Sequence, residues 1–485
     1  MLNSFSQGQD STSGKVVIDS DGSLLSAGGR SLEQIKTRQR EFFLKNKTRP
    51  WKFRDRQLQL LFDALRDHKE EIIAAVQKDL GKSYTEAFVT EVGFILDEIR
   101  TLRKGLKKWM KPKKIFPGLL ILPGRAKILR EPKGQVLVIA PWNYPLQLGL
   151  TPLVGALAAG NCCVIKPSEY TPHATKVMRE ILTKIFSEEY VAVFEGGPAT
   201  SNHLLEKPWD HIFFTGSTKV GQIIAEKAAK TLSPATLELG GKSPCIIDET
   251  CNLKLAARRV MWGKFFNTGQ TCVAPDYLII HKSVKDKFLK LCVKNIEVFF
   301  GKDPSQSPDY GRIVSKQHTE RLASFLELGK VHTGGIANIS DRYLSPTIIE
   351  VLDTSDKLMT EEIFGPILPV ITYDDLDHVV EDLSRKDRPL ALYLFSKDQD
   401  SIDKVMEQAS FGGGCINDVI MHLANHNLPF GGIGNSGFGR YHGEYSFNTF
   451  SHHKSIVTQS AWLDIPARYP PLGAFKKKLF EFIMG

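Results

Sequence analysis

Residues 134 to 230 alternate short apolar runs with helix-forming segments, and this alternation restricts the fold more than any other feature. The runs GQVLVIAP, CCVIKP, YVAVFEG and DHIFFTG predict four strands, because each is short, largely apolar and bounded by polar or turn-forming residues. The segments TPLVGALAAGN, TPHATKVMREILTKIF and STKVGQIIAEKAAK predict helices between and after them. Continuously apolar strands are typical of a parallel sheet that helices cover on both faces, so an α/β fold is predicted.

A second α/β series follows Pro234 and extends to about residue 430. It begins with the strands TLELGG and SPCIID, and neither a repeat nor a low-complexity linker separates it from the first series. A chain of 485 residues is too long for one ordinary hydrophobic core. We therefore expect two or three domains that pack closely together.

The N-terminal part of the chain has a different character. Residues 1–28 are rich in Ser, Gly and Asp, which predicts a mobile tail. From Leu32 to Gly105 apolar residues recur at three- and four-residue spacing, which predicts helices, and Gly81 is a candidate C-terminal cap. Residues 113–131 contain two prolines and are expected to form an extended excursion.

The seven cysteines argue against two kinds of site. Their number is odd and no pair shows CxxC spacing, so neither a disulfide framework nor a zinc ribbon is expected, and a reducing compartment is favoured. No apolar signal segment is visible near the N-terminus, and no run approaches the roughly 18 apolar residues that a membrane span requires. These features predict a cytoplasmic location.

The net charge of +9 is concentrated in residues 103–133, where Lys and Arg greatly outnumber the one acid, Glu131. Such a run can bind an anionic surface, either lipid or nucleic acid, or it can be a solvated helix end and connector. The segment has little aromatic interleaving and no nucleic-acid motif. The second interpretation is therefore favoured, and no nucleic-acid partner is expected.

Two glycine patterns compete as a dinucleotide site. GGIGNSG at 431–437 matches the spacing GxGxxG, but neither a convincing strand nor a convincing helix flanks it, so a turn-rich loop is predicted. GSTKVG at 216–221 does not match that spacing, yet the strand HIFF leads into it and a helix follows. Backbone N–H groups at a helix N-terminus suit a pyrophosphate. Gln222 follows Gly221 where a Walker A loop has Lys, so that motif is excluded.

Three polar residues in short motifs are candidates for catalysis, and each has a structural alternative. Cys272 in FNTGQTCVAP is either a nucleophile or a small buried hydrophobe. Glu238 in TLELGG has apolar neighbours that favour its neutral form, which suits a general base, but on this segment alone an ion-paired strand residue is favoured. Asn143 in APWNYP can donate to an oxyanion or can be a turn residue between prolines.

Further candidates lie in KPSE and EEIFGP, and one pair resembles a metal motif. EEIFGP offers Glu362 and Phe364 before a Gly-Pro turn, but by itself this stretch indicates only an acidic helix end. Lys166 and Glu169 follow a strand at the position where a ribose binds to an open α/β sheet, although ordinary loop polarity explains them equally well. His422 and His426 have helical spacing for two ligands, but the Glu of HExxH is missing and no third ligand is obvious. No metal is expected.

Eight motifs together resemble one family. PWNYPLQL, KPSE, FTGSTKVG, LELGGKSP, FNTGQTCVAPDY, EEIFGPILPV, CINDVIMH and LPFGGIGNSGFGRYHGEYSFNTFSH have the order and spacing found in the NAD(P)-dependent aldehyde dehydrogenases. They look most like the class 3 branch, which includes fatty-aldehyde and aromatic-aldehyde enzymes. The resemblance covers roughly residues 32–471.

The resemblance implies a Rossmann-like cofactor domain, an α/β catalytic domain and a small bridging sheet that joins dimers. The implied boundaries are 29–112 and 132–237 for the NAD(P)-binding domain, 238–430 for the catalytic domain, 113–131 and 431–457 for the bridging elements, and 458–485 for a C-terminal extension. A homodimer is the implied assembly. The family binds its dinucleotide through a GxxxxG-like turn, which agrees with the choice of residues 216–221.

The resemblance also implies a role for each motif residue. It assigns the nucleophile to Cys272, the general base to Glu238, and the oxyanion donor to Asn143, assisted by the backbone N–H of Cys272. The implied cofactor contacts are Lys166 and Glu169 for the adenosine ribose, Gly216, Ser217 and Gly221 for the pyrophosphate, and Glu362 and Phe364 for the nicotinamide ribose and ring.

The implied reaction is oxidation of an aldehyde to a carboxylic acid, with medium- or long-chain aliphatic or aromatic aldehydes as substrates. Glu169 disfavours the 2′-phosphate of NADP while Lys166 offsets this effect, so we expect NAD to be preferred and NADP to be used to some extent. A CoA-acylating enzyme is an alternative, but Glu238 argues against it, because branches that exclude water commonly lack this carboxylate. A catalytically idle structural protein is a third interpretation, which the complete set of catalytic residues disfavours.

The C-terminal stretch FKKKLFEFIMG differs from the anchored or lipidated relatives of this branch. Phe475, Leu479, Phe482 and Ile483 fall on one helical face beside three lysines. The helix is expected either to touch a lipid surface or to dock on a partner subunit or over the substrate funnel. Docking on protein is favoured, so a peripheral membrane contact is an alternative and not the expectation.

Overall fold

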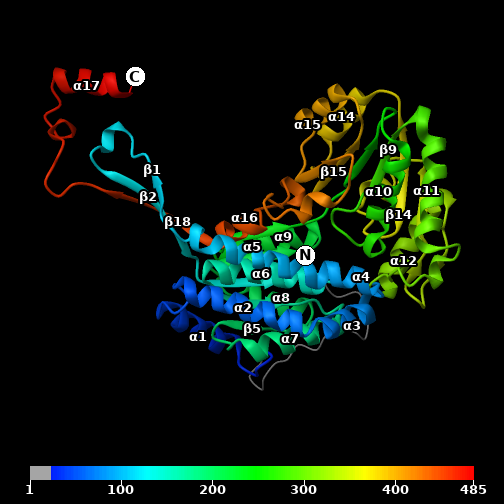
Figure 1. Cartoon of the computed structure of the whole chain (residues 1–485), viewed down its shortest axis with the longest axis horizontal. Coiled ribbons are helices and arrows are strands. Elements are labelled where there is room, and N and C mark those ends of the chain that lie inside the picture. The colour runs from blue at the N-terminus through cyan, green and yellow to red at the C-terminus, as the bar shows by residue number, and fades with distance from the viewer. Residues whose placement is uncertain (1–22, 485) are drawn as a thin grey trace.

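The computed structural model describes residues 23–484, which form two large sheets with their helices and a projecting arm (Figure 1). Residues 1–22, most of the predicted mobile tail, lie outside this range. Leu24 is buried and the Ser26 hydroxyl donates to Glu188, so the end of the predicted tail contacts the body of the protein.

The first sheet has six strands and is parallel except at one edge. In spatial order the strands are β17 (Gly437–Phe438), β7 (Ala235–Glu238), β6 (His211–Thr215), β3 (Gln135–Ile139), β4 (Cys162–Lys166) and β5 (Val191–Val193). Only β17 runs antiparallel to its neighbour. The four strands predicted between residues 134 and 215 are therefore confirmed.

Helices cover this sheet and belong to two groups. Those that alternate with the strands are α6 (Pro145–Ala159), α7 (Pro172–Ile185), α8 (Pro198–Leu205) and α9 (Thr218–Lys230). The N-terminal group consists of α1 (Leu32–Leu44), α2 (Trp51–Asp67), α3 (Lys69–Leu80), α4 (Tyr84–Ala87), the π-helical segment η1 (Phe88–Gly93) and α5 (Phe94–Trp109). In this group α2 and α5 pack against α6, and α3 packs against α7.

Helix α6 begins earlier than the sequence predicts. It starts at Pro145 instead of Thr151, because proline is compatible with the first turn of a helix. The predicted end is confirmed, since Gly160 follows the helix with a φ of 93°. Gly81 caps α3 in the same left-handed conformation, with a φ of 65°, as predicted.

The second sheet has seven strands and confirms a second α/β series, but this series begins at β8, because the predicted strand TLELGG forms β7 of the first sheet. In spatial order they are β10 (Gly329–Thr333), β13 (Thr347–Val351), β14 (Ile367–Tyr373), β9 (Tyr277–His281), β8 (Pro244–Ile247), β15 (Ala391–Phe395) and β16 (Gly413–Ile416). All neighbours are parallel except β10 and β13. The accompanying helices are α10 (Leu253–Phe265), α11 (Lys285–Phe300), α12 (Lys316–Ser324), α13 (Lys357–Thr360), α14 (Leu376–Arg385) and α15 (Gln399–Gln408).

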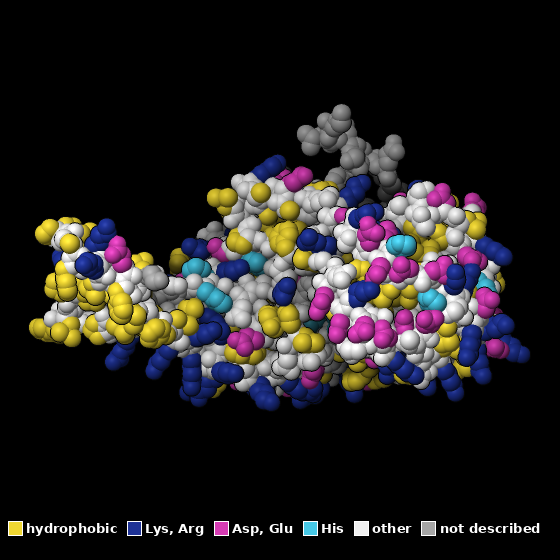
Figure 2. Space-filling view, turned by 90° about the horizontal axis from the view of Figure 1, so that it is seen from above, with side chains coloured by type: hydrophobic (Ala, Val, Ile, Leu, Met, Phe, Trp, Pro, Cys, Tyr) yellow, Lys and Arg dark blue, Asp and Glu magenta, His cyan; other side chains and the backbone are white. Residues whose placement is uncertain are grey.

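A three-stranded arm projects from the body (Figure 1). It consists of β1 (Lys113–Ile115), β2 (Arg125–Pro132) and β18 (Ser451–Thr458), and the chain then leads to α17 (Ala474–Met484). Figure 2 shows hydrophobic side chains gathered on the part of the molecule formed by the arm and α17. In this part the exposed fraction is 72% for Phe116, 96% for Trp462 and 88% for Phe482. None of the helices within residues 23–484 has both the length and the apolar character needed to cross a bilayer.

The motif GGIGNSG does not form part of this arm. Its last residue, Gly437, pairs with Glu238 as β17 adds to the edge of the first sheet, and α16 (Gly443–Thr449) then packs against α5 and α6. Residues Gly434–Ser436 form a turn, as predicted. The two-residue strand Gly437–Phe438 that follows is not predicted from the sequence.

Candidate active site

Cys272 lies in a tight loop that follows α10. Three consecutive residues before it have left-handed backbones, with φ values of 51° at Asn267, 55° at Thr268 and 75° at Gly269. Such a conformation costs about 1 kcal/mol or more for a residue other than glycine, and it persists where the surrounding structure enforces it. The motif FNTGQTC therefore specifies a fixed turn that carries the half-buried residue Cys272.

The buried side chain of Gln270 holds this turn in place. Its amide donates to the carbonyl oxygens of Asn267, at 3.1 Å, and Arg312, at 3.0 Å. Its Oε1 atom accepts the N–H of Val314 at 2.9 Å. The sequence alone gives no signal of a role for this residue beyond its place in the motif. These hydrogen bonds fix the loop two residues before Cys272, so Gln270 has a positioning role.

Asn143 reaches the same loop from the carboxyl end of β3. Its side chain is 3% exposed, and Nδ2 donates to the carbonyl oxygen of Gln270 at 3.0 Å. The hydroxyl groups of Tyr144 and Thr271 are 2.5 Å apart. The structure thus brings the motifs APWNYP and FNTGQTC into contact at two points. An amide NH₂ has two hydrogens, so one remains for a substrate oxygen.

Glu238 is the last residue of β7 and is 2% exposed. Neither carboxylate oxygen has a hydrogen-bond partner among residues 23–484. Burial raises the pKa of this carboxyl well above its ordinary value, and Arg440 offsets this only partly. The neutral form is thus favoured, as the apolar neighbours in the sequence predict.

Burial and two carboxylates change the pKa of the Cys272 thiol. Burial, followed by the charges of Glu362 and Glu238, raises its pKa to about 12. Because both carboxylates act on this thiol, the structure brings together a cysteine, two acids and the Asn143 amide. Without a proton acceptor this thiol stays neutral near pH 7.

The Glu362 carboxylate packs against Gly240, and its charge acts on the Cys272 thiol. A Cβ atom at Gly240 would lie 2.3 Å from Oε1 of Glu362, so a larger residue there would have to displace the Glu362 carboxylate. Burial and the neighbouring charge of Asp276 raise the pKa of Glu362 to about 8. Phe364 has a φ of 50°, and its ring packs edge-on against Trp142 at 5.3 Å.

The carboxyl edge of the first sheet carries the predicted ribose residues. Lys166 ends β4, and its Nζ donates to Oε2 of Glu169 at 2.8 Å. The carboxyl ends of parallel strands meet at one edge, so this pair lies at the same edge as the Asn143 turn after β3 and the glycine turn after β6. This edge is where an open α/β sheet binds a nucleotide.

The turn GSTKVG opens α9 at that edge. Exposed Ser217 caps the helix, with Oγ accepting the N–H of Val220 at 3.4 Å. A Cβ atom at Gly216 would lie 2.4 Å from the Phe214 ring, and one at Gly221 would lie 2.6 Å from Leu239. Both glycines are therefore needed for the close packing of this turn, and the helix N-terminus can receive an anion.

His422 and His426 face different partners and do not converge. His426 contacts the carboxylates of Asp97 and Glu98, whereas Nδ1 of His422 lies 3.6 Å from Sγ of Cys415. In the part of the chain that the structure describes, no three His, Cys, Asp or Glu side chains are arranged to hold a metal ion.

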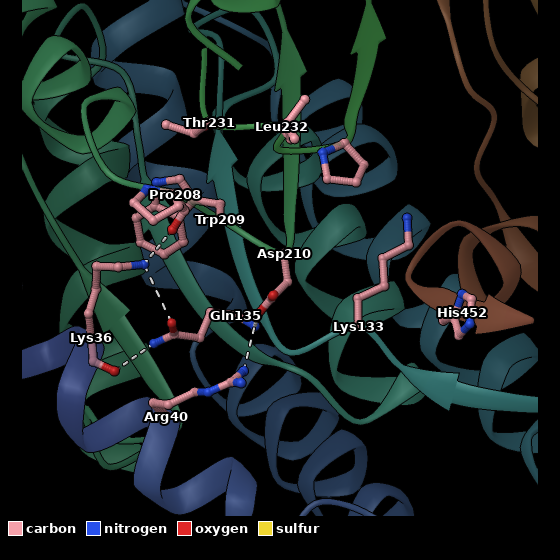
Figure 3. A pocket seen from close by; sticks show the side chains of 11 residues that line it. Lys36, Arg40, Lys133, Gln135, Pro208, Trp209, Asp210, Thr231, Leu232 and His452 are labelled. Atoms are coloured by element: carbon pink, nitrogen blue, oxygen red, sulfur yellow. Dashed lines mark hydrogen bonds and ion pairs between the residues drawn. The ribbon is translucent and has the colours of Figure 1, made fainter. Parts of the chain in front are cut away.

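An open surface cleft lies away from these residues (Figure 3). Lys36, Lys133, Gln135 and Trp209 line it at the amino ends of β3 and β6. Nζ of Lys36 donates to the Pro208 carbonyl oxygen and lies 3.8 Å from the centre of the Trp209 ring. The cleft contains none of the candidate site residues and is on the opposite edge of the sheet, so it does not belong to the active site.

Comparison with known sequences supports this assembly of motifs. The model of the aldehyde dehydrogenase family matches residues 26–456. The 4,4′-diaponeurosporen-aldehyde dehydrogenase of Staphylococcus aureus is 46% identical over 438 residues, which cover 90% of this chain and 95% of the relative. Human aldehyde dehydrogenase family 3 member B1 is 45% identical over 436 residues, which cover 90% and 93%.

Solved structures show the same similarity. The substrate-bound AldH of Staphylococcus aureus superposes with a TM-score of 0.91 at 44% identity, covering 93% of this chain and 99% of that one. PnpE from Pseudomonas, in complex with nicotinamide adenine dinucleotide, superposes with a TM-score of 0.82 at 26% identity, covering 94% and 96%. The described architecture is therefore that of the aldehyde dehydrogenase fold.

Proposed function

The chain belongs to the aldehyde dehydrogenase family and is therefore an oxidoreductase that acts on aldehydes; we propose that it forms carboxylic acids through a thiohemiacetal and a thioester on Cys272. The observation that carries this proposal is that the Asn143 amide bonds to the loop of Cys272 while the charge of the buried Glu238 carboxylate raises the pKa of the Cys272 thiol. Such a set supplies a nucleophile, a base and an oxyanion donor.

Glu238 is proposed to take the proton of the Cys272 thiol. Burial raises the pKa of both groups, so the thiol ionises only when its proton can be transferred, and a carboxylate of raised pKa is a stronger proton acceptor than an ordinary one. After Glu238 has released that proton to solvent and the acyl group is on sulfur, the same carboxylate can activate the water that releases the acid. Its oxygens lack other partners among the described residues, so they are free for that proton transfer.

Asn143 is proposed to stabilise the negative charge that develops on the substrate oxygen. One hydrogen of its amide is held by the Gln270 carbonyl, which fixes the orientation of the other. The backbone N–H of Cys272 is the second proposed donor. Fixed donors of this kind need no reorganisation during the reaction, which is why they stabilise a transition state effectively.

The residues at the sheet edge fit a dinucleotide. The exposed, glycine-lined N-terminus of α9 suits a pyrophosphate, and the Lys166–Glu169 pair suits a ribose. The charge of Glu362 acts on the Cys272 thiol, and the Phe364 ring packs against Trp142 beside Asn143. NAD(P), when bound, supplies the acceptor for the hydride that the substrate carbon loses. We expect NAD to be preferred, because Glu169 would repel the 2′-phosphate of NADP.

Medium- and long-chain aliphatic or aromatic aldehydes are the proposed substrates. The chain is 45% identical over 436 residues to human aldehyde dehydrogenase family 3 member B1, and resemblance to this branch implies such substrates. The Staphylococcus relative is named for a diaponeurosporenal, which is consistent with such a substrate.

A kinetic panel tests this proposal. The purified chain is mixed with octanal, hexadecanal or benzaldehyde and with NAD or NADP, in the absence of CoA, and both the reduced cofactor and the acid are measured. The proposal predicts equal amounts of the two products, with NAD favoured. Acid formation that requires CoA would instead support the acylating alternative, and no reduced cofactor with any aldehyde would support the idle structural one.

A homodimer formed through the arm is proposed as the assembly. Within residues 23–484, the outer strands of the arm, β1 and β18, each have an unpaired edge, and Phe116 and Trp462 are mostly exposed. Edges and apolar patches of this kind are typical of interfaces. Light scattering tests the dimer, and co-sedimentation with liposomes of the full chain and of a chain ending at residue 473 tests the alternative of lipid contact.

A further inference from the structure

A buried ion pair lies behind the Asn143 turn. The side chains of Lys82 and Glu91 are completely inaccessible to solvent, and Nζ of Lys82 is 2.8 Å from Oε1 of Glu91. Burying two charges is expensive, and replacing such a pair by apolar residues is often neutral or stabilising. Stability alone therefore does not explain why the pair is present.

The pair contacts four of the five residues from 143 to 147. Lys82 donates to the Asn143 carbonyl at 3.1 Å, and Nζ lies 4.0 Å from the centre of the Tyr144 ring. The other carboxylate oxygen of Glu91 accepts the N–H groups of Leu146 and Gln147 at 3.0 and 3.1 Å. Residue 145 is a proline and has no N–H to offer. The two charges thus fix residues 143–147 from one side.

Glu91 replaces the cap that α6 lacks. The residue before this helix is Tyr144, whose side chain makes no capping hydrogen bond. A carboxylate at a helix N-terminus binds the free N–H groups and complements the helix dipole. Glu91 can reach this position from η1, a π-helical segment, which leads into α5 and so lies beside α6. Single π-helical turns often occur near functional sites.

A second set of contacts connects the turn to the Cys272 loop. Nδ2 of Asn267 donates to the same Asn143 carbonyl oxygen at 2.8 Å and to the Gln270 carbonyl oxygen at 3.1 Å. The Asn143 side chain donates to that Gln270 oxygen as well. Lys82 and Asn267 therefore both donate hydrogen bonds to the backbone carbonyl of Asn143, while the side-chain amide of Asn143 points toward the Cys272 loop.

We propose that Lys82 and Glu91 are positioning residues, which orient the Asn143 amide for the oxyanion of the aldehyde reaction. This inference rests on the proposed function and adds to it a cause for the orientation of Asn143. Neither residue touches the substrate in this scheme. Their effect on turnover must therefore pass through Asn143, and it must disappear when the Asn143 side chain is removed.

A double-mutant cycle tests this dependence. Glu91→Gln, Asn143→Ala and the double variant are compared at saturating NAD, below the lowest thermal midpoint of the set. We expect Glu91→Gln to lower kcat by about 10- to 100-fold when Asn143 is present and by less than about threefold in Asn143→Ala, with NAD affinity unchanged. An equal loss in both backgrounds would overturn the inference.

Asp79 provides the matched control. Its buried carboxylate accepts the N–H groups of His173 and Ala174 at the start of α7, as Glu91 does for α6. Asp79→Asn should lower the thermal midpoint but should show no coupling to Asn143→Ala. Coupling of similar size for Asp79 would mean that any lost helix cap disturbs the site, which would contradict a specific role of Glu91.

Lys82→Met is the second variant, for the case in which Glu91→Gln does not fold. It removes the bond to the Asn143 carbonyl but keeps the Glu91 cap on α6, and the same coupling is expected. If the unaltered protein oxidises no aldehyde, the proposed function is wrong. The inference is then decided by crystal structures of the unaltered protein and Lys82→Met, where an Asn143 amide in the same orientation would overturn it.

Discussion

Gly240 and Glu362 lie so close together that a Cβ atom at position 240 would be 2.3 Å from Oε1 of the glutamate. Gly240 belongs to the motif LELGG, and Glu362 belongs to the motif EEIFGP, 122 positions further along the chain. Because Gly240 has no side chain, the Glu362 carboxylate can occupy the space beside it. Since the Glu362 charge also raises the pKa of Cys272, this contact connects the proposed cofactor site with the proposed nucleophile.

Gly240→Ala is expected to weaken NAD binding. The new methyl group must push the Glu362 carboxylate away, and loss of one hydrogen bond from a charged group is worth about 1.5 to 3 kcal/mol, or roughly tenfold or more in affinity. Quenching of tryptophan fluorescence by NAD measures the change. Gly473→Ala is the control, because a Cβ atom there meets no neighbour within 4 Å. Unchanged NAD affinity in Gly240→Ala would remove Glu362 from the cofactor site.

Asn143→Ala is expected to lower kcat by about 10² to 10³ and to leave NAD affinity nearly unchanged. Removal of one oxyanion donor typically has this effect, because the bond is strongest in the transition state. Steady-state production of NADH and a separate binding titration measure the two quantities. Turnover within a factor of about three of the unaltered protein would exclude the oxyanion role.

The rate should rise with pH through a carboxyl group of unusually high pKa. Burial raises the pKa of Glu238 well above its ordinary value, so the group is protonated, and inactive as a base, until the pH exceeds the raised pKa. We therefore expect kcat to increase at a pH above the usual carboxyl range, and Glu238→Gln to lack that limb. A profile already flat from pH 5 upward would contradict this assignment.

The sequence predicts the first sheet well, because its strands are short, apolar and bounded by turn residues. It does not predict β17, since a strand of two residues has no periodicity and depends entirely on the edge of β7. The sequence also predicts too late a start for α6. Proline is common both in turns and in the first turn of a helix, so the sequence around Pro145 does not distinguish the two.

The candidate site residues came from motifs, whereas the residues that support them did not. Gln270, Lys82 and Glu91 have partners that are 44, 61 and 55 positions away in the chain. Lys82 and Glu91 also lie in a region of ordinary helical periodicity, where charged residues are normally solvated. Their burial depends on the packing of η1 against α6, which local sequence patterns do not contain.

Gly269→Ala is expected to lower the free energy of unfolding by about 2 to 5 kcal/mol. Alanine must adopt a φ of 75° there, which costs about 1 to 2 kcal/mol, and its Cβ would lie 2.2 Å from the Gly365 carbonyl oxygen. Gly29→Ala is the control, since its φ is 76° but no atom lies within 4 Å of the new Cβ. Denaturant unfolding should show only the backbone part of the loss for Gly29→Ala, and equal losses for the two variants would contradict the clash.

Alkylation of Cys272 in the cofactor-free protein should continue to accelerate above pH 9. Only the thiolate reacts with iodoacetamide, and burial together with the Glu362 and Glu238 charges raises the thiol pKa to about 12. The thiolate fraction therefore keeps growing at pH values where an ordinary thiol, with a pKa near 9.0, is already mostly ionised. Mass spectrometry of the peptide that contains Cys272 measures the rate, and Cys272→Ala identifies that peptide. A rate that levels off near pH 7 would mean that the thiol is ionised at rest, and Glu238 would then be needed only for the water that releases the acid.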